Sequence, residues 1–217
     1  MQRRPDSTLE LDLAAVPPGP GGERPRRGTD EVSRAIVEAT VRIIGTGGVA
    51  AVTHRAVARQ AGVSLSSTTY HFDSKGQIID AALRAVAARE IERVEHATAA
   101  LSGEVREIDA LVDALVGWLE DQLAGDRLVV RAGYELQLES VRSPELDELH
   151  RAWGRAVQRL AANVLERAGS PSPRHDAHIL AAFIDGVRLE EITRPRPDVG
   201  TRMRPLFDRF LQALIGG

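Results

Sequence analysis

The sequence predicts an all-α protein, and three observations support this. Residues suited to helix N-caps recur directly before short apolar patterns with helical spacing. No segment alternates apolar and polar residues as a half-buried strand would. Hydrophobic residues make up 43% of the 217 residues but aromatic ones only 4%, so the predicted core is aliphatic.

Composition divides the chain into three parts. Residues 1–27 are predicted to form a disordered basic arm, because they are rich in proline and glycine and lack sustained periodicity. Residues 28–75 are predicted to form a three-helix domain, and residues 76–217 a second helical domain. Between Arg24 and Ile79 there are eight basic and four acidic residues, whereas the whole chain carries a net charge of −3. This asymmetry favours a nucleic-acid-binding surface on the N-terminal part alone.

The first helix is expected to begin near Thr29, which is a suitable N-cap. Asp30 and Glu31 follow it, and their negative charge favours the positive end of a helix dipole. Apolar residues then recur three and four positions apart, which predicts a single buried stripe. The glycine-rich stretch 45–48 is expected to end this helix.

The next two predicted helices are short and joined by a tight turn. Thr53 is expected to cap one and Ser64 the other, with the sequence Ala-Gly-Val-Ser at 61–64 between them. A fourth helix is expected to open at Asp73 or Ser74, where Ser74 and Gln77 fit a capping box. Two short helices around a glycine turn predict a helix-turn-helix, whose second helix enters the DNA major groove.

The remaining chain is predicted to be helical almost throughout. Glycine and proline clusters separate the segments, and a proline follows Ser143 at a first helical position. The later helices are predicted over about 74–100, 105–124, 128–141, 144–168, 174–193 and 201–215.

The third helix has the composition of a DNA-reading helix. Short hydroxyl side chains can reach base edges, while Val63 and Phe72 are expected to anchor the helix to the core. Lys75 at a helix N-terminus and the arginines before the first helix favour phosphate and minor-groove contacts. The predicted DNA-binding residues are Arg26, Arg27, Thr53, His54, Arg55, Ser64, Ser66, Ser67, Thr68, Thr69, Tyr70, His71 and Lys75.

Residues 28–80 resemble the N-terminal domain of the tetracycline-repressor (TetR) family of bacterial transcription regulators. The turn, the helix caps and the spacing between them all agree with the family pattern. The matching residues are Ala39 to Gly48, Thr53, Val57-Ala58, Ala61-Gly62-Val63-Ser64, His71-Phe72 and Ser74-Lys75.

This sequence departs from the family pattern at one point. Members usually place a tyrosine three residues before the phenylalanine that ends the recognition helix, but here that position holds Thr69 and the tyrosine is Tyr70. We therefore assign both residues to DNA contact and leave open which of them takes the phosphate.

The resemblance implies a C-terminal domain that forms a homodimer and encloses a small-molecule pocket. The helices at about 144–168 and 174–193 are the candidates for the dimer contact, since small residues permit close helix approach. Sparse aromatic and polar residues suit a pocket wall, and they equally suit an ordinary core. The pocket candidates are Trp118, Tyr134, Gln137, Leu138, Trp153 and Phe183.

The predicted function is therefore ligand-responsive transcription regulation. A homodimer is expected to bind a palindromic operator as a repressor, and a small-molecule effector of unknown identity is expected to release it. The alternative is a small-molecule-binding or interaction protein without sequence-specific DNA binding, favoured by the displaced tyrosine. No catalytic constellation, metal site or cofactor motif is found, and no enzyme activity is expected. The absence of cysteine and of long apolar runs favours a cytoplasmic protein without membrane contact.

Overall fold

The structure is a computed structural model that describes residues 27–99, 108–125 and 127–215. These residues form α-helices and one short 3-10 helix, without strands, as the sequence predicts. The elements are α1 (Arg27–Gly47), η1 (Val49–Ala51), α2 (His54–Ala61), α3 (Leu65–His71), α4 (Lys75–Ala99), α5 (Ile108–Gly125), α6 (Arg127–Ser140), α7 (Pro144–Arg167), α8 (Pro173–Thr193) and α9 (Val199–Ile215).

Local side-chain contacts explain the short N-terminal helices. Thr53 Oγ1 accepts a hydrogen bond from the Ala56 backbone N–H at 3.1 Å, so Thr53 caps α2 as predicted. Ser64 caps α3 in the same way. Gly62 between them has φ 69°, the left-handed conformation that glycine adopts without strain. The helix that was expected to begin at Thr29 begins two residues earlier, at Arg27.

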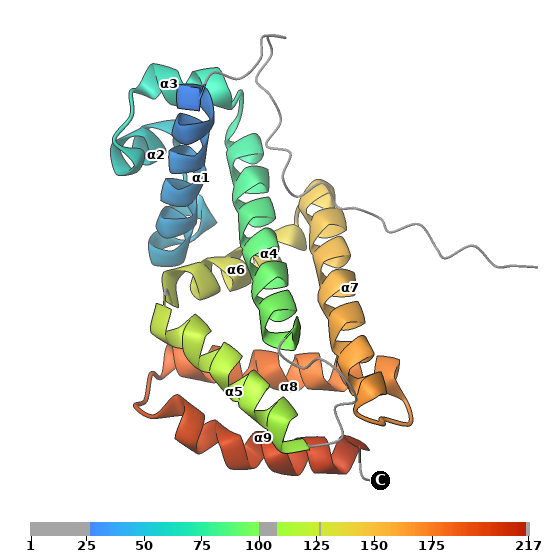
Figure 1. Cartoon of the computed structure of the whole chain (residues 1–217). Helices are drawn as coiled ribbons and strands as arrows, with labels where there is room; N and C mark the ends of the chain where they lie inside the picture. Colours follow the sequence, from blue (N-terminus) through green and yellow to red (C-terminus); the bar gives the residue numbers. More distant parts are fainter. Residues whose placement is uncertain (1–26, 100–107, 126, 216–217) are drawn as a thin grey trace, which may run out of the picture.

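The helices are arranged around two apolar cores. The first core joins α1 and α2 to α4, α6 and the beginning of α7. The second core joins α5, α8 and α9 to the end of α7. In Figure 1, α1, α2 and α3 lie at one end of the molecule and α8 and α9 at the other, with α4 and α7 running side by side between them. The predicted boundary at residues 75 and 76 stays a prediction, and apolar packing crosses it.

One close contact fixes α6 beneath the N-terminal helices. Gly45 on α1 lies against the start of α6, where a Cβ atom would come within 2.3 Å of the Leu128 carbonyl oxygen. Only a residue without a side chain permits this approach. Helix α6 also lines the cavity, so this contact links the N-terminal helices to the cavity wall.

A buried carboxylate fixes the turn between α8 and α9. Glu191 is completely buried and accepts two hydrogen bonds from Arg202, each of 2.9 Å, and one of 2.7 Å from Arg196. Such bidentate pairs are both strong and directional.

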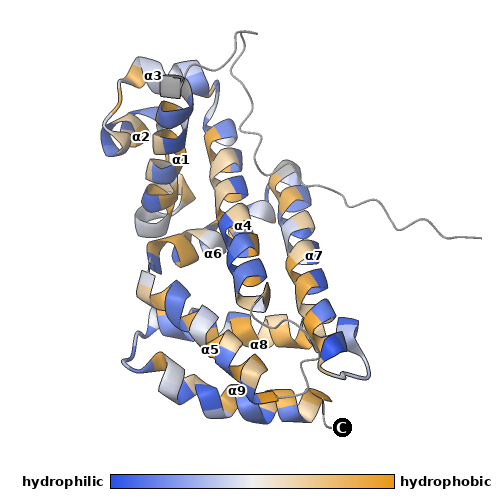
Figure 2. Ribbon diagram, in the orientation of Figure 1, coloured by the Kyte–Doolittle hydropathy of each residue, from blue (hydrophilic) through white to orange (hydrophobic). Residues whose placement is uncertain are grey.

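Within the described ranges, no helix is long and apolar enough to cross a membrane. Figure 2 shows hydrophilic and hydrophobic residues interleaved along the helices, which is the pattern of helices with one buried face.

Candidate nucleic-acid interface and ligand cavity

Helix α3 exposes a cluster of hydroxyl groups at one end of the molecule. Ser64 Oγ lies 2.8 Å from Ser66 Oγ and 2.7 Å from Ser67 Oγ, so the three hydroxyls form one network. Ser64 and Ser66 are exposed and Ser67 is half-buried. The network holds the hydroxyls in place at the N-terminal end of α3, the end that reads base edges in a helix-turn-helix.

The structure corrects the prediction for Thr68. Its side chain is completely buried, and its hydroxyl donates to the Leu65 carbonyl oxygen at 2.8 Å. Thr68 faces the core because it lies four residues before Phe72, which is also buried, on the same side of the helix. It therefore supports α3 from within and cannot contact DNA. Val63, the other predicted anchor, is partly buried against the same core.

Thr69 and Tyr70 both face solvent. Tyr70 is 69% exposed, and its ring meets the His71 ring edge-on with the centroids 5.2 Å apart. Partial burial lowers the pKa of His71, and the nearby Asp30 carboxylate opposes this shift. His71 is thus held mainly neutral near pH 7. Both side chains are exposed, so burial excludes neither from the predicted phosphate contact.

The start of α4 adds a cation beside α3. Ser74 Oγ accepts from the Gln77 N–H at 3.2 Å, and Gln77 Oε1 accepts from the Asp73 N–H at 2.8 Å. This is the reciprocal cap predicted for the pair, with the glutamine reaching one residue further back. It leaves the exposed Lys75 at the positive end of the helix dipole, where an anion is favoured.

The other predicted DNA contacts lie near the beginning of α2. Thr53 and Arg55 are exposed, while His54 is half-buried and its Nδ1 has no hydrogen-bond partner. Arg26 lies outside the described residues, as does most of the predicted arm, and Arg27 is the first residue of α1.

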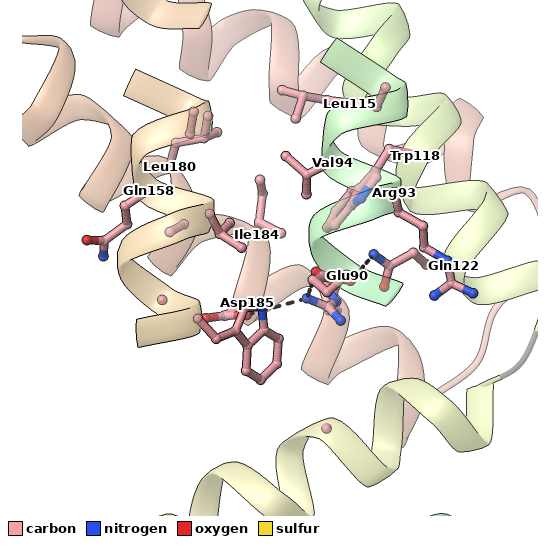
Figure 3. A pocket seen from close by; sticks show the side chains of 18 of the residues that line it. Glu90, Arg93, Val94, Leu115, Trp118, Gln122, Gln158, Leu180, Ile184 and Asp185 are labelled. Carbon is pink, nitrogen blue, oxygen red and sulfur yellow. Dashed lines mark hydrogen bonds and ion pairs between the residues drawn. The ribbon is translucent and has the colours of Figure 1, made fainter. Parts of the chain in front are cut away.

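A cavity of about 290 Å³ lies between the two apolar cores. Side chains from α4, α5, α6, α7 and α8 line it, and most of them are apolar. Figure 3 shows Leu180 and Ile184 on one side of this space and Val94 and Leu115 on the other. The size and lining are those of a small-molecule site.

Four of the six predicted pocket residues line this cavity: Trp118, Tyr134, Gln137 and Trp153. The prediction is wrong for the other two. Leu138 is 65% exposed, because one residue beyond Gln137 the helix has rotated by about 100°, away from the cavity. Phe183 packs into the second core and stacks on Phe210, with ring centroids 4.3 Å apart.

A buried ion pair spans the cavity wall between α4 and α8. Glu90 on α4 is only 6% exposed. Its Oε1 accepts a hydrogen bond from Arg188 Nη1 at 3.0 Å, and its Oε2 accepts one from Gln122 Nε2 at 2.7 Å. Figure 3 shows Glu90 joined to Gln122, with Asp185 on the other side of Glu90. Asp185 Oδ1 lies 3.9 Å from the same Arg188 Nη1.

The guanidinium of Arg188 also lies against two aromatic rings. It is 5.4 Å from the ring centroid of Trp118 and 5.6 Å from that of Tyr134, within the range of cation–π attraction. The Tyr134 hydroxyl donates to the Asp185 carboxylate, 3.1 Å away. Burial raises the pKa of Tyr134 far above its usual value, although Arg188 opposes the shift, so this hydroxyl remains a donor.

Several buried polar atoms of cavity-lining residues have no hydrogen-bond partner. Unpaired buried polar groups are uncommon in folded proteins, and at a cavity wall they are available for hydrogen bonds with a bound small molecule. Burial also lowers the pKa of His150, which keeps its ring neutral near pH 7 against the opposing effect of Asp147. The unpaired atoms are Trp118 Nε1, Gln122 Oε1, His150 Nδ1, Trp153 Nε1 and Arg188 Nε.

The sequence analysis missed the polar centre of this cavity, namely Glu90, Gln122, Asp185 and Arg188. A signal was present, since Glu90 continues the buried stripe of Leu83, Val86 and Ala87 at helical spacing. A charged residue on an apolar stripe must find a partner, and here the partner is 98 positions away. Among the described residues, no three His, Asp or Glu side chains converge as a metal site requires.

Comparisons with known proteins match both the N-terminal helix-turn-helix and the C-terminal helical region that holds the cavity. A sequence profile described as "Bacterial regulatory proteins, tetR family" matches residues 36–82, and one described as "Tetracyclin repressor-like, C-terminal domain" matches residues 106–217. The HTH-type transcriptional regulator BetI of Rhizobium meliloti (strain 1021) is 31% identical over 178 residues, which cover 80% of this chain and 84% of BetI.

Two solved structures are similar in both sequence and fold. A TetR family member, SCO1917 from Streptomyces coelicolor A3, is 33% identical with a TM-score of 0.66, covering 83% of this chain and 98% of its own. The multidrug binding protein EbrR complexed with imidazole is 32% identical with a TM-score of 0.62, covering 86% of this chain and 96% of its own. EbrR has also been solved with proflavin, ethidium and malachite green. The chain described here therefore belongs to the tetracycline-repressor (TetR) family of bacterial transcription regulators.

Proposed function

We propose that this chain is a ligand-responsive repressor that binds a palindromic operator as a homodimer. A small molecule in the cavity shifts the dimer to a form in which the two recognition helices no longer fit successive turns of the major groove. The DNA contacts come from the exposed predicted residues of α2, α3 and Lys75.

The observation that carries this proposal is the continuity of α4 between the two sites. Lys75 is the first residue of α4, and Glu90 on the same helix lines the cavity. Fifteen residues of α-helix separate them by about 22 Å. Helix α6 supplies a second link, because it packs on α1 at Gly45 and lines the cavity through Tyr134.

The required coupling is modest. A change of about 1–3 kcal/mol in the relative stability of the two forms corresponds to about 5–150-fold in operator affinity. A ligand supplies it only if it binds one form better than the other. A ligand in contact with both α4 and α6 can do so, since both helices reach the N-terminal domain.

The two copies pair through α8, with α7 at the flank of the interface. Leu189 on α8 is 49% exposed, and a Cβ atom at Gly186 would meet nothing within 4 Å, so this face is open and partly apolar. The exposed face of α7 carries Arg151, Arg155 and Arg159. Like charges favour a solvated flank over the centre of a two-fold contact. Half-sites about 34–36 Å apart then match the two recognition helices.

The ligand has an aromatic body. Imidazole, proflavin, ethidium and malachite green, the molecules found with EbrR, are all aromatic nitrogen compounds. The cavity of this chain offers Trp118, Tyr134 and Trp153 as matching walls. Aromatic pairs add about 0.5–1.5 kcal/mol beyond the burial of their surface.

A gel shift with the DNA upstream of the protein's own gene, at a stated salt concentration, tests DNA binding. The wild type is expected to shift this DNA and not an unrelated duplex. Ser66→Glu, which places a carboxylate on the exposed face of α3, is expected to abolish the shift. Thr201→Glu, at an exposed position of α9, adds the same charge and is expected to leave it intact. A wild type that binds both duplexes equally would favour the alternative of a protein without sequence-specific DNA binding.

Sedimentation measurements test the dimer contact. Leu189→Glu is expected to shift the protein toward the monomer, since it places two carboxylates in the interface. Leu138→Glu is the matched control, because Leu138 is also an exposed leucine but lies on α6. This variant is expected to remain dimeric. A dimer unaffected by Leu189→Glu would remove α8 from the proposed interface.

A further inference from the structure

Glu90 and its neighbours hold a cationic group, the guanidinium of Arg188, inside the cavity wall. The buried Glu90 carboxylate accepts from the Arg188 guanidinium, which lies against the rings of Trp118 and Tyr134, and Gln122 orients the carboxylate by donating to its Oε2. A carboxylate with two aromatic faces is the combination that recognises organic cations in apolar surroundings.

The cation that Glu90 holds within this chain is the guanidinium of Arg188. The side chain of Arg188 is 11% exposed and that of Glu90 is 8% exposed, with 3.0 Å between Nη1 and Oε1. The hydrogen bonding of Arg188 is incomplete, because its Nε is buried without a partner. A second acceptor lies on its own helix, where Asp185 Oδ1 is 3.9 Å from the same Nη1.

We propose that the effector is an aromatic organic cation that takes the place of the Arg188 guanidinium on Glu90, and that Arg188 then pairs with Asp185. This inference rests on the proposed function, since it treats the cavity as the effector site. It adds the charge of the ligand and the residue that the ligand displaces.

Burial makes this exchange easier for a cation than for an anion. When a cation binds Glu90, Arg188 keeps a carboxylate partner in Asp185, whose side chain is 50% exposed and can move. An anion that removed Arg188 from Glu90 would leave a buried carboxylate with only an amide partner, which is costly. An anion at the free Nε–H of Arg188 would face two carboxylates, both within 4 Å of the same guanidinium.

The exchange also explains how ligand binding would reach the DNA-binding helices. The Glu90–Arg188 pair joins α4 to α8 across the cavity. Displacement of Arg188 breaks this link and frees α4 to move relative to the proposed dimer helix. An uncharged ligand could fill the apolar part of the cavity without breaking it.

Phenyltrimethylammonium and tert-butylbenzene are suitable probes, because they share one heavy-atom framework and differ in charge. Binding to the full-length protein is measured by quenching of the fluorescence of its two tryptophans, Trp118 and Trp153. The wild type is expected to prefer the cation. Arg188→Gln removes the internal competitor and is expected to tighten cation binding about tenfold, while Glu90→Gln is expected to weaken it by about the same factor. Both variants are expected to bind tert-butylbenzene as the wild type does.

Asp185→Asn keeps the proposal testable if loss of the buried pair impairs folding. Its side chain is half exposed, and an amide oxygen can still accept from Tyr134. It is expected to weaken cation binding several-fold without affecting the neutral probe, because displaced Arg188 loses its second carboxylate. Weaker cation binding in Arg188→Gln, or unchanged binding in Glu90→Gln, would overturn the exchange. If the wild type and all variants bound the two probes equally well, the exchange would be overturned, but the proposed regulation would still stand. If the protein bound neither probe, the cavity would be removed from both proposals.

Discussion

The helix-turn-helix and the cavity differ in how far apart along the chain their contacting residues lie. In α3, the polar contacts of the serine and threonine side chains join residues two to four positions apart. In the cavity, Gln122 and Glu90 are 32 positions apart, Tyr134 and Asp185 are 51 apart, and Arg188 and Glu90 are 98 apart. A site built from local contacts leaves a readable pattern in the sequence. A site built from distant ones becomes visible only when the helices are packed.

The same difference predicts which substitutions are most damaging, with the largest losses of stability at contacts between distant helices. Glu191→Gln is expected to lower the free energy of unfolding by about 3 kcal/mol, because it leaves Arg196 and Arg202 without their buried anion. Chemical denaturation of variant and wild type measures this. Glu190→Gln, at the exposed neighbour, is the matched control and should change stability little. Equal losses in the two variants would contradict the role of Glu191.

Glu191 also predicts a dependence of stability on pH. Hydrogen bonds from Arg202, and then from Arg196, outweigh burial and lower the pKa of this carboxyl from 4.5 to about 2. The folded state binds the proton more weakly than the unfolded state, so the stabilisation is complete above pH 4.5 and disappears as the pH falls toward 2. The thermal midpoint of the wild type is expected to fall more steeply across this range than that of Glu191→Gln. Parallel curves would contradict the assignment.

Gly45→Ala tests the contact that joins the two regions. The added Cβ would lie 2.3 Å from the Leu128 carbonyl oxygen, so α1 or α6 must shift. The expected cost is about 1–3 kcal/mol, typical of overpacking, together with a weaker effect of ligand on DNA affinity. Gly117→Ala on α5, where a Cβ meets nothing within 4 Å, is the control. Unchanged stability would mean that the helices adjust freely.

Gly62→Ala tests the local turn within the helix-turn-helix. Here a Cβ has open space, so the whole effect comes from the positive φ of 69°. The expected loss is about 1–2 kcal/mol, smaller than at the contacts between distant helices. Thermal unfolding measures it, with Gly117→Ala again as control. A loss larger than that of Glu191→Gln would reverse the comparison between the two regions.

Lys75→Ala is expected to have the smallest effect on stability and a defined effect on DNA binding. Loss of one phosphate contact should lower the slope of log affinity against log salt by about one unit and weaken binding to all operators alike. Arg209→Ala, at an exposed position of α9, is a control for the loss of one positive charge. An unchanged slope in Lys75→Ala would remove this residue from the DNA contact.

The sequence alone determined the all-α class, the caps at Thr53 and Ser64, the turn at Gly62 and the hydroxyl-rich recognition helix. It could do so because each of these features depends on residues within one or two turns of helix. Even there it failed at Thr68, since the face that a residue presents depends on how its helix is rotated against the core.

Tertiary structure decided the cavity. It placed Trp118, Tyr134, Gln137 and Trp153 around one space, and it turned Leu138 to solvent and Phe183 into the second core. It also brought Glu90 to Arg188, whose charges are adjacent in space only because α4 and α8 both border the same cavity. Helical periodicity indicates that a residue faces inward, but the partner it meets there is set by the packing of helices that lie far apart along the chain.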